Sequence, residues 1–149
     1  MDNRCVSVQI GDIGEAHAIY EFTRLGIPVS KPVNNSMVYD LIIDVNNALY
    51  KVQVKTTSGL IKPAYNMTFD LTKLDVRSNR NAHYSYTSEE VDFFYLYCIE
   101  ENIGVLLPVE DAPKTAVSFR QLKYAPANGQ RKGIRFVEDY TVEKVLGLS

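Results

Sequence analysis

The sequence predicts an α/β fold in which a central mixed β-sheet is flanked by helices. Three observations favour this class: apolar residues recur at helical spacing near the N-terminus, two β-rich segments flank an Asn-Asn pair, and two further apolar segments follow in the second half. The chain has 149 residues, of which 46% are hydrophobic. That length and composition suit one hydrophobic core, so we expect a single domain spanning residues 1–149.

The first element is expected to be an amphipathic helix. Asp12 is a candidate N-cap, Glu15 follows it at the spacing of a capping box, and Gly26 supplies a helix stop. Residues 27–33 then predict a short edge strand interrupted by prolines, followed by a polar turn at residues 34–36. The core-facing side of the helix is expected to carry Ile13, Ala16, Ile19, Phe22 and Leu25.

The next segment predicts a β-hairpin. Residues 39–45 and 49–56 are both rich in β-branched and aromatic residues, which fit the pleated surface of a sheet. Asn46 and Asn47 lie between the two segments. Because asparagine tolerates positive φ, this pair suits a two-residue hairpin turn.

The hairpin register brings three polar residues together. With Asn46 and Asn47 as the turn, the numbers of facing residues add up to 93, so Asp40 lies across from Gln53. Since side chains alternate between the two faces of a strand, Asp40, Gln53 and Lys55 then share one face at one end of the hairpin. A bulge would shift this register by one residue.

The remaining elements are expected to be short. The polar and basic residues 59–82 predict a loop, with a strand near residues 65–71. Two buried strands, a further short strand and a terminal helix follow, at residues 91–99 and 105–109 around a turn at 102–104, at 120–126, and at 141–146.

The formal net charge is −2, but the charges are segregated along the chain. Residues 88–111 contain seven acidic residues and no lysine or arginine, which disfavours contact with a phosphate backbone. Residues 112–137 contain six basic residues and no acidic ones. A polyanion could dock on this basic stretch, although a charge run is more often a solvated face.

Several classes of protein are disfavoured. The longest apolar runs are far shorter than the roughly 20 residues that a membrane span needs, so no membrane partner is expected. The N-terminal residues lack the apolar core of a secretory signal, which favours a cytoplasmic or nucleoid location. Cys5 and Cys98 lack the spacing of a metal site, so no zinc site is expected.

The three polar residues at the hairpin end suit phosphodiester hydrolysis. That reaction needs a divalent cation held by oxygen ligands and a positive group that orients the attacking water. Asp40 supplies a carboxylate, Gln53 an amide oxygen, and the backbone carbonyl of Val54 a third ligand. Lys55 is the candidate for activating water. Glu15 is either a further catalytic residue, a helix-capping residue, or both.

The order of these residues resembles the PD-(D/E)XK nuclease superfamily, whose signature is an acid, a gap, and then acid-x-Lys on paired strands. Asp40 matches the first acid, although Tyr39 stands where the signature has proline. Gln53-Val54-Lys55 matches the second part, with Gln53 in place of the usual carboxylate, which puts binding of two metals in doubt. The resemblance implies a restriction-endonuclease-like core.

Within that superfamily the chain is most similar to group I intron-encoded homing endonucleases, which carry a Q-x-K variant and an N-terminal helix glutamate. Residues 86–94 and 122–130 extend the similarity. The resemblance implies a homo-oligomer, either dimer or tetramer, that uses Mg²⁺, with Mn²⁺ a plausible substitute. Its expected substrate is a long double-stranded DNA site, where a double-strand break lets repair copy an intron in.

DNA contacts are expected around residues 59–83 and 114–135. Lysine and arginine there suit phosphates, whereas the amides of Gln121, Asn128 and Gln130 suit the edge of adenine in the major groove. The full expected set is Lys62, Lys73, Arg77, Arg80, Lys114, Arg120, Gln121, Lys123, Asn128, Gln130, Arg131, Lys132 and Arg135.

Two other functions remain open. A Holliday junction resolvase or a restriction-like nuclease would use the same helix glutamate, strand aspartate and lysine, so the chemistry alone does not separate them. A catalytically silent DNA-binding module is a second alternative, and Gln53 is its best argument, because it removes one negative charge from the metal site. Such a module would bind DNA without magnesium and give no cleavage product.

Overall fold

The fold is built on a five-stranded mixed sheet. In the computed structural model, which describes residues 3–34, 37–74 and 83–148, the strand order is β1-β2-β3-β7-β8. Within this sheet β3 and β7 pair in parallel, whereas the other neighbouring strands pair antiparallel. The strands are β1 (Val29–Ser30), β2 (Leu41–Val45), β3 (Ala48–Thr57), β7 (Phe93–Cys98) and β8 (Ile103–Pro108). The mixed sheet and its flanking helices confirm the expected fold class.

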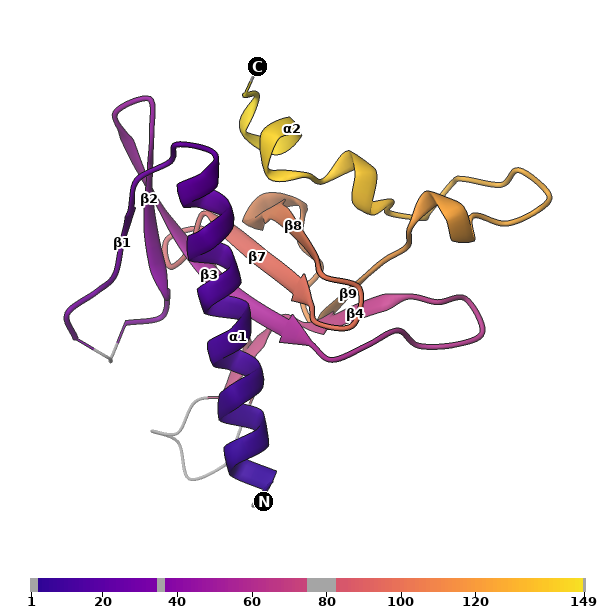
Figure 1. The fold of residues 1–149 in the computed structure, drawn as a ribbon, viewed down its shortest axis with the longest axis horizontal. Coiled ribbons are helices and arrows are strands. Elements are labelled where there is room, and N and C mark those ends of the chain that lie inside the picture. The colour runs from indigo at the N-terminus through magenta and orange to yellow at the C-terminus, as the bar shows by residue number, and fades with distance from the viewer. Residues whose placement is uncertain (1–2, 35–36, 75–82, 149) are drawn as a thin grey trace.

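Helix α1 (Asn3–Arg24) lies across one face of the sheet, and its N-terminal half extends past the strands (Figure 1). The expected start at Asp12 is wrong, because the helix begins nine residues earlier and contains both Asp12 and Glu15 in its interior. No proline interrupts the preceding residues, and a helical glycine costs only about 1 kcal/mol, so nothing stops the helix there. The expected end is confirmed: Gly26 follows α1 with φ of 77°.

The sheet separates two hydrophobic clusters. On the side of α1, Ala18 and Phe22 pack with Val52, Val54 and Tyr95. The opposite cluster includes Phe69, Phe94, Leu96 and Phe119. Because side chains alternate along β3, the inward valines on the α1 side leave Gln53 and Lys55 on the opposite side.

The hairpin is confirmed in detail. β2 and β3 pair antiparallel from Leu41 with Val52 to Val45 with Ala48, which is the expected register without a bulge. Asn46 and Asn47 form the turn with φ of 52° and 67°. The local sequence was sufficient here because the turn type and strand twist fix the pairing.

Two small ribbons flank the main sheet. β4 (Met67–Asp70) pairs with β9 (Ala116–Phe119), and β5 (Thr72–Leu74) pairs with β6 (His83–Ser85). β4 lies within the expected strand at residues 65–71. The β5–β6 ribbon was missed, since its strands have three residues each and little apolar character.

The second half shows two further differences. The turn before β8 is centred on Asn102, with φ of 53°, while Ile103 and Gly104 already belong to the strand. The strand expected at residues 120–126 is wrong: residues Leu122–Tyr124 form a short 3-10 helix, and the strand there is the earlier β9, whose alternate residues Val117 and Phe119 are buried.

A short 3-10 helix at Val109–Asp111 follows β8, and another at Val137–Asp139 precedes a terminal helix. That helix, α2 (Val142–Leu146), is confirmed where it was expected, and the Thr141 side chain caps it by accepting a hydrogen bond from the Lys144 amide at 3.3 Å. Within the described ranges, no helix has the length and apolar character to cross a membrane.

Candidate active site at the end of the hairpin

Asp40 is fixed at the point where the chain joins the hairpin. Its amide donates a hydrogen bond to the Val52 carbonyl at 2.9 Å. Its Oδ2 accepts a hydrogen bond from the Val54 amide, also at 2.9 Å. In the hairpin register Val54 would pair with Tyr39, but β2 starts only at Leu41, so the Asp40 carboxylate takes the place of the missing strand residue.

The Val54 carbonyl and the Gln53 amide meet beside this carboxylate. In a β-strand the N–H and C=O of one residue point toward the same edge, so the Val54 carbonyl faces the edge that Asp40 occupies. Gln53 Nε2 donates to that carbonyl at 3.4 Å, which is long for a hydrogen bond. Rotation of the amide exchanges nitrogen for oxygen, so Gln53 can present either a donor or a ligand at this point.

Glu15 reaches the same site from α1. Glu15 and Asp40 line one cavity of about 130 Å³, and Glu15 forms an ion pair with Lys31 at its rim. Burial raises the pKa of Asp40, and the Glu15 charge raises it further, while the Val54 hydrogen bond, Lys55 and Lys31 act in the opposite direction. Two carboxylates thus face one space, and the Lys31 ammonium compensates the charge of Glu15 beside it.

Lys55 is two residues after Gln53 on the same face of β3, and its side chain is half-buried. Its Nζ donates a hydrogen bond to the Thr72 carbonyl at 2.9 Å and lies 5.3 Å from the centre of the Tyr86 ring. Burial lowers the pKa of Lys55, although the charges of Asp70 and Asp40 oppose this shift. The ammonium is therefore close to the carboxylates and only partly solvated.

The donor set fits one hard divalent cation. The described residues contain no cluster of three or more histidine, cysteine, aspartate and glutamate side chains. The oxygen donors that converge are instead the Asp40 carboxylate, the Val54 carbonyl and the Gln53 amide, with Glu15 nearby. Mg²⁺ and Mn²⁺ prefer such oxygen ligands, and a cation would neutralise the paired carboxylates.

The two segments expected to contact DNA meet in space. The rings of Tyr65 and Tyr124 stack with centres 4.6 Å apart and planes 15° apart. Lys62 lies over Tyr65 at 6.0 Å and Lys123 over Tyr124 at 5.1 Å. In Figure 1 the loop before β4 and the segment after β9 project from the same side of the molecule. We refer to these segments, residues 58–66 and 120–135, as the paired arms.

The expected DNA-contacting residues differ in whether their side chains are exposed or already bound to other residues. Arg120 Nε donates to Asn66 Oδ1 at 3.3 Å and thereby ties the paired arms together. Lys73 forms an ion pair with Glu90, so its charge is already compensated. Those with exposed side chains are Lys62, Lys114, Lys123, Asn128, Gln130, Arg131 and Lys132.

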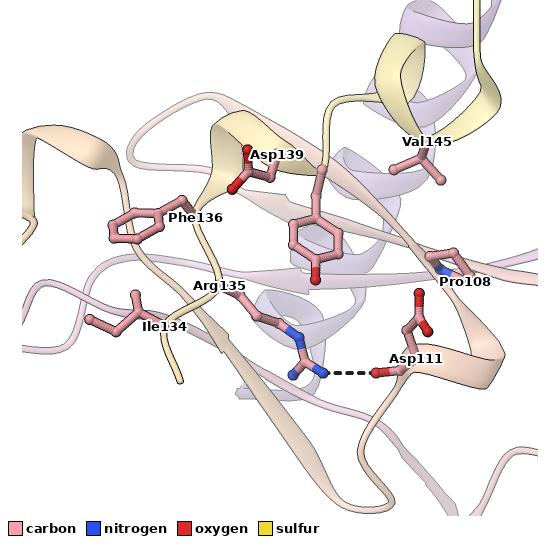
Figure 2. Close-up of a pocket in the computed structure, with 8 residues that line it drawn as sticks. Pro108, Asp111, Ile134, Arg135, Phe136, Asp139 and Val145 are labelled. Carbon is pink, nitrogen blue, oxygen red and sulfur yellow. Dashed lines mark hydrogen bonds between the residues drawn. The ribbon is translucent and has the colours of Figure 1, made fainter. Parts of the chain in front are cut away.

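Four expected contacts remain, and the structure describes two of them. Gln121 is only 8% exposed, so its position does not fit direct reading of a base. Arg135 donates through Nη2 to the Asp111 carbonyl at 2.8 Å, on the wall of an open cavity of about 410 Å³ (Figure 2). Arg77 and Arg80 lie outside the described residues.

Several neighbours of the site were not expected from the sequence. Lys31, Asp70 and Thr72 approach Glu15 or Lys55 only because the chain folds back from separate elements. Tyr86 belongs to the segment whose resemblance was noted, yet no residue pattern indicated that its ring would lie against Lys55. No local periodicity indicates such contacts, since they join elements that are distant in the sequence.

The chain is similar to known nucleases in its sequence pattern and in its fold. A family model described as "PD-(D/E)XK endonuclease" matches residues 6–143. The solved structure of a bacterial homing endonuclease, I-Ssp6803I, is similar with a TM-score of 0.73 and 25% sequence identity, covering 94% of this chain and 91% of that one. Hjc, a Holliday junction resolvase from Archaeoglobus fulgidus, has a TM-score of 0.49 and 10% identity, covering 92% and 95%. No curated protein sequence matches the chain significantly.

Proposed function

The chain belongs to the PD-(D/E)XK endonuclease family, and from this premise we propose that it is a metal-dependent, sequence-specific DNA endonuclease of the homing type. The observation that carries the proposal is the convergence of Asp40, Gln53, the Val54 carbonyl and Lys55 at one hairpin end, beside Glu15. The product would be a double-strand break in duplex DNA.

Each residue has a distinct role in this proposal. Asp40, the Val54 carbonyl and Gln53 would hold one Mg²⁺ or Mn²⁺ ion, with Glu15 adding negative charge across the cavity. The bound ion supplies stabilisation of the charge that develops on the phosphate and lowers the pKa of a bound water. Lys55 directs its ammonium toward the attacking water, and the half-buried position keeps that charge from being screened.

The homing assignment rests on similarity over nearly the whole chain. The similar bacterial homing endonuclease matches 94% of this chain at 25% identity. An enzyme that reads a long duplex needs contacts beyond the scissile phosphate, and the exposed lysines of the paired arms supply them. Residues Lys62, Lys114, Lys123, Arg131 and Lys132 are the proposed phosphate contacts.

An even-numbered homo-oligomer follows from the chemistry of a double-strand break. Each chain carries one candidate site, whereas the duplex has two strands to cut. A dimer or tetramer places two sites on the two strands. Sedimentation of the purified protein at its working concentration measures this directly, and a monomer would contradict it.

The test is cleavage of a randomised duplex library and of a four-way junction in the presence and absence of Mg²⁺. The native protein should cut a few long, related duplex sites only with the metal. Asp40→Ala and Lys55→Ala should each reduce the rate by at least about 100-fold while the protein still binds DNA. Asp44→Ala is the matched control, because Asp44 lies on the same hairpin and outside the site.

The outcomes separate the possible functions. Cutting of the junction without any duplex site would favour a resolvase over a homing enzyme. DNA binding that ignores magnesium, with no product from any substrate, would favour the silent module. If Lys55→Ala cut as fast as the native protein, the proposed roles of the hairpin residues would be wrong even though a nuclease is present.

A further inference from the structure

Lys55 is enclosed by a part of the molecule that has no role in the proposal so far. Its Nζ donates to the Thr72 carbonyl on β5, at 2.9 Å. The ring of Tyr86, the residue directly after β6, lies 5.3 Å from the same nitrogen. Strand β5 and the residue that follows β6 therefore each contact the same ammonium group.

The Thr72 carbonyl is itself held by a neighbouring turn. Asp70 Oδ1 accepts hydrogen bonds from the Thr72 amide at 2.8 Å and from the Thr72 hydroxyl at 2.7 Å. Two bonds from one carboxylate oxygen to one residue fix the local backbone. Because the backbone is fixed, the direction of the carbonyl that receives Lys55 is fixed as well.

The Tyr86 ring is anchored in the core. It packs edge-on against Phe94, with ring centres 5.3 Å apart and planes 86° apart. Phe94 is fully buried on β7, the strand that pairs in parallel with β3. The ring thus has a defined position relative to the strand that carries Lys55, and its face attracts a cation.

A second lysine, Lys73, also lies near the Tyr86 ring, but its ammonium is bound to a different partner. Lys73 lies 5.5 Å from the Tyr86 ring centre, but it forms an ion pair with Glu90. Glu90 in turn accepts hydrogen bonds from the Thr87 amide at 3.0 Å and the Thr87 hydroxyl at 3.2 Å. The Lys73 charge is therefore compensated and held in place.

We propose that Tyr86 and the Asp70–Thr72 turn are positioning elements for Lys55, which hold its ammonium in the direction needed for the cleavage reaction. This inference rests on the proposed function of Lys55. The ring restricts the lysine from one side and the carbonyl restricts it from another, so a long and flexible side chain loses most of its conformational freedom before substrate arrives.

The first test uses nuclear magnetic resonance on the full chain without DNA. The side-chain Hε protons of Lys55 should resonate upfield of ordinary lysine values, because they lie over the Tyr86 ring. Tyr86→Leu should abolish that shift, whereas Tyr86→Phe should keep it. This readout does not depend on activity, so it remains valid even if no cleavage substrate is found.

The second test measures single-turnover cleavage of the duplex recovered from the randomised library. Tyr86→Leu and Asp70→Ala should each slow cleavage about tenfold, with DNA affinity within about twofold of native. Tyr86→Phe should rescue the rate, since the ring rather than the hydroxyl makes the contact. Tyr84→Leu is the matched control: Tyr84 is a 45% exposed tyrosine on the same ribbon.

Defined results would overturn the inference. If Tyr86→Leu left the Lys55 proton shifts unchanged, the ring would not hold the lysine. If Tyr86→Phe cleaved as slowly as Tyr86→Leu, the hydroxyl and not the ring would matter. If Tyr84→Leu caused the same loss, the effect would report general damage to the ribbon. Failure of the native protein to cut any DNA would overturn the proposed function, while the proton shifts would still test the contact.

Discussion

Gln53 is the residue at which the candidate metal site departs from the family signature. Its amide lies beside the Val54 carbonyl, where the family signature has a carboxylate. A neutral amide oxygen binds a hard cation more weakly than a charged one, so the site depends on Asp40 and Glu15 for its negative charge. We therefore expect the site to hold one cation weakly. The affinity of the protein for that cation should respond strongly to added charge at position 53.

Gln53→Glu should increase the affinity for Mn²⁺ by about tenfold, because the substitution adds a charged ligand at the same length. Isothermal titration of the protein alone measures the change. Asp40→Ala should abolish binding in both backgrounds, and Asp44→Ala should leave it unaltered. Equal affinity of the native and Gln53→Glu proteins would show that position 53 does not touch the metal.

His17 is a half-buried residue outside the site that should make stability depend on pH. Its Nδ1 lies 2.8 Å from the Tyr95 hydroxyl, and its ring stacks on Tyr97 with centres 4.0 Å apart. Burial lowers the pKa of His17 below 6.5, although Glu21 and Asn102 oppose the shift. The folded protein therefore binds a proton on this ring less readily than the unfolded chain does.

The sign of the pH effect follows from that difference. As the pH falls below 6.5, the unfolded chain gains a proton that the folded protein does not yet accept, so the free energy of unfolding should decrease until the folded pKa is passed. Urea denaturation at a series of pH values measures this slope. His17→Gln should make the slope shallower, whereas His83→Gln, at an exposed position, should not. Identical slopes for all three proteins would contradict the assignment to His17.

At the scale of elements, the close contact between α1 and β3 depends on the absence of a side chain at Gly14. Gly14 lies on the buried side of α1, and a Cβ there would overlap the Thr56 hydroxyl. Gly11, three residues earlier on the same helix, is exposed and has open space around it. The two glycines thus share a helix but differ in what they contact.

The two glycines should respond in opposite directions to the same substitution. Gly14→Ala should lower the free energy of unfolding by about 1–3 kcal/mol through overpacking. Gly11→Ala should raise it by about 0.5–1 kcal/mol, because alanine favours the helix. Urea denaturation measures both. Combining Gly14→Ala with Thr56→Ala should recover part of the loss, and strictly additive effects would argue against a direct contact.

The sequence was sufficient for elements formed by neighbours in the chain. The hairpin register was predictable because Asn46 and Asn47 specify the turn and the strand pattern specifies the faces. The convergence of Asp40, Gln53 and Lys55 follows directly from that register. The start of α1 was not predictable in the same way, since a capping pattern at Asp12 also occurs inside a longer helix.

What the sequence did not provide depends on contacts between distant elements. Lys31 reaches Glu15, and Thr72 and Tyr86 reach Lys55, only in the assembled fold. The β5–β6 ribbon has too few apolar residues to show a period, and a two-stranded ribbon is at best marginally stable by itself. Gln121 is a further example, because it is buried although its polar side chain predicts an exposed position.

At the scale of the whole molecule, the stacked Tyr65 and Tyr124 join two basic segments into one projecting surface. The paired arms should therefore bind DNA as a unit. Lys62→Ala and Lys123→Ala should each reduce the slope of log affinity against log salt by about 0.9, as expected for loss of one phosphate contact. Fluorescence anisotropy with duplex DNA at several salt concentrations measures the slope.

Disrupting the stack tests whether the arms act together. Tyr65→Ala removes no charge, yet it should weaken DNA binding by more than about fivefold by releasing both arms. Lys144→Ala is the control for the lysine variants, because Lys144 lies on α2 and donates to the Glu138 carbonyl. A Tyr65→Ala protein with native affinity would indicate that the arms bind independently.

The parallel pairing of β3 with β7 has a consequence for how the protein is made. Val52 pairs with Phe93, which is synthesised later. At typical translation rates, one edge of β3 therefore stays unpaired for about 2–8 s during synthesis. An unpaired edge strand is a template for aggregation, and charged side chains on it oppose such association. Lys51 and Lys55 both lie on this strand. We therefore expect Lys55, the proposed catalytic lysine, to protect the nascent chain from aggregation before the candidate site has formed.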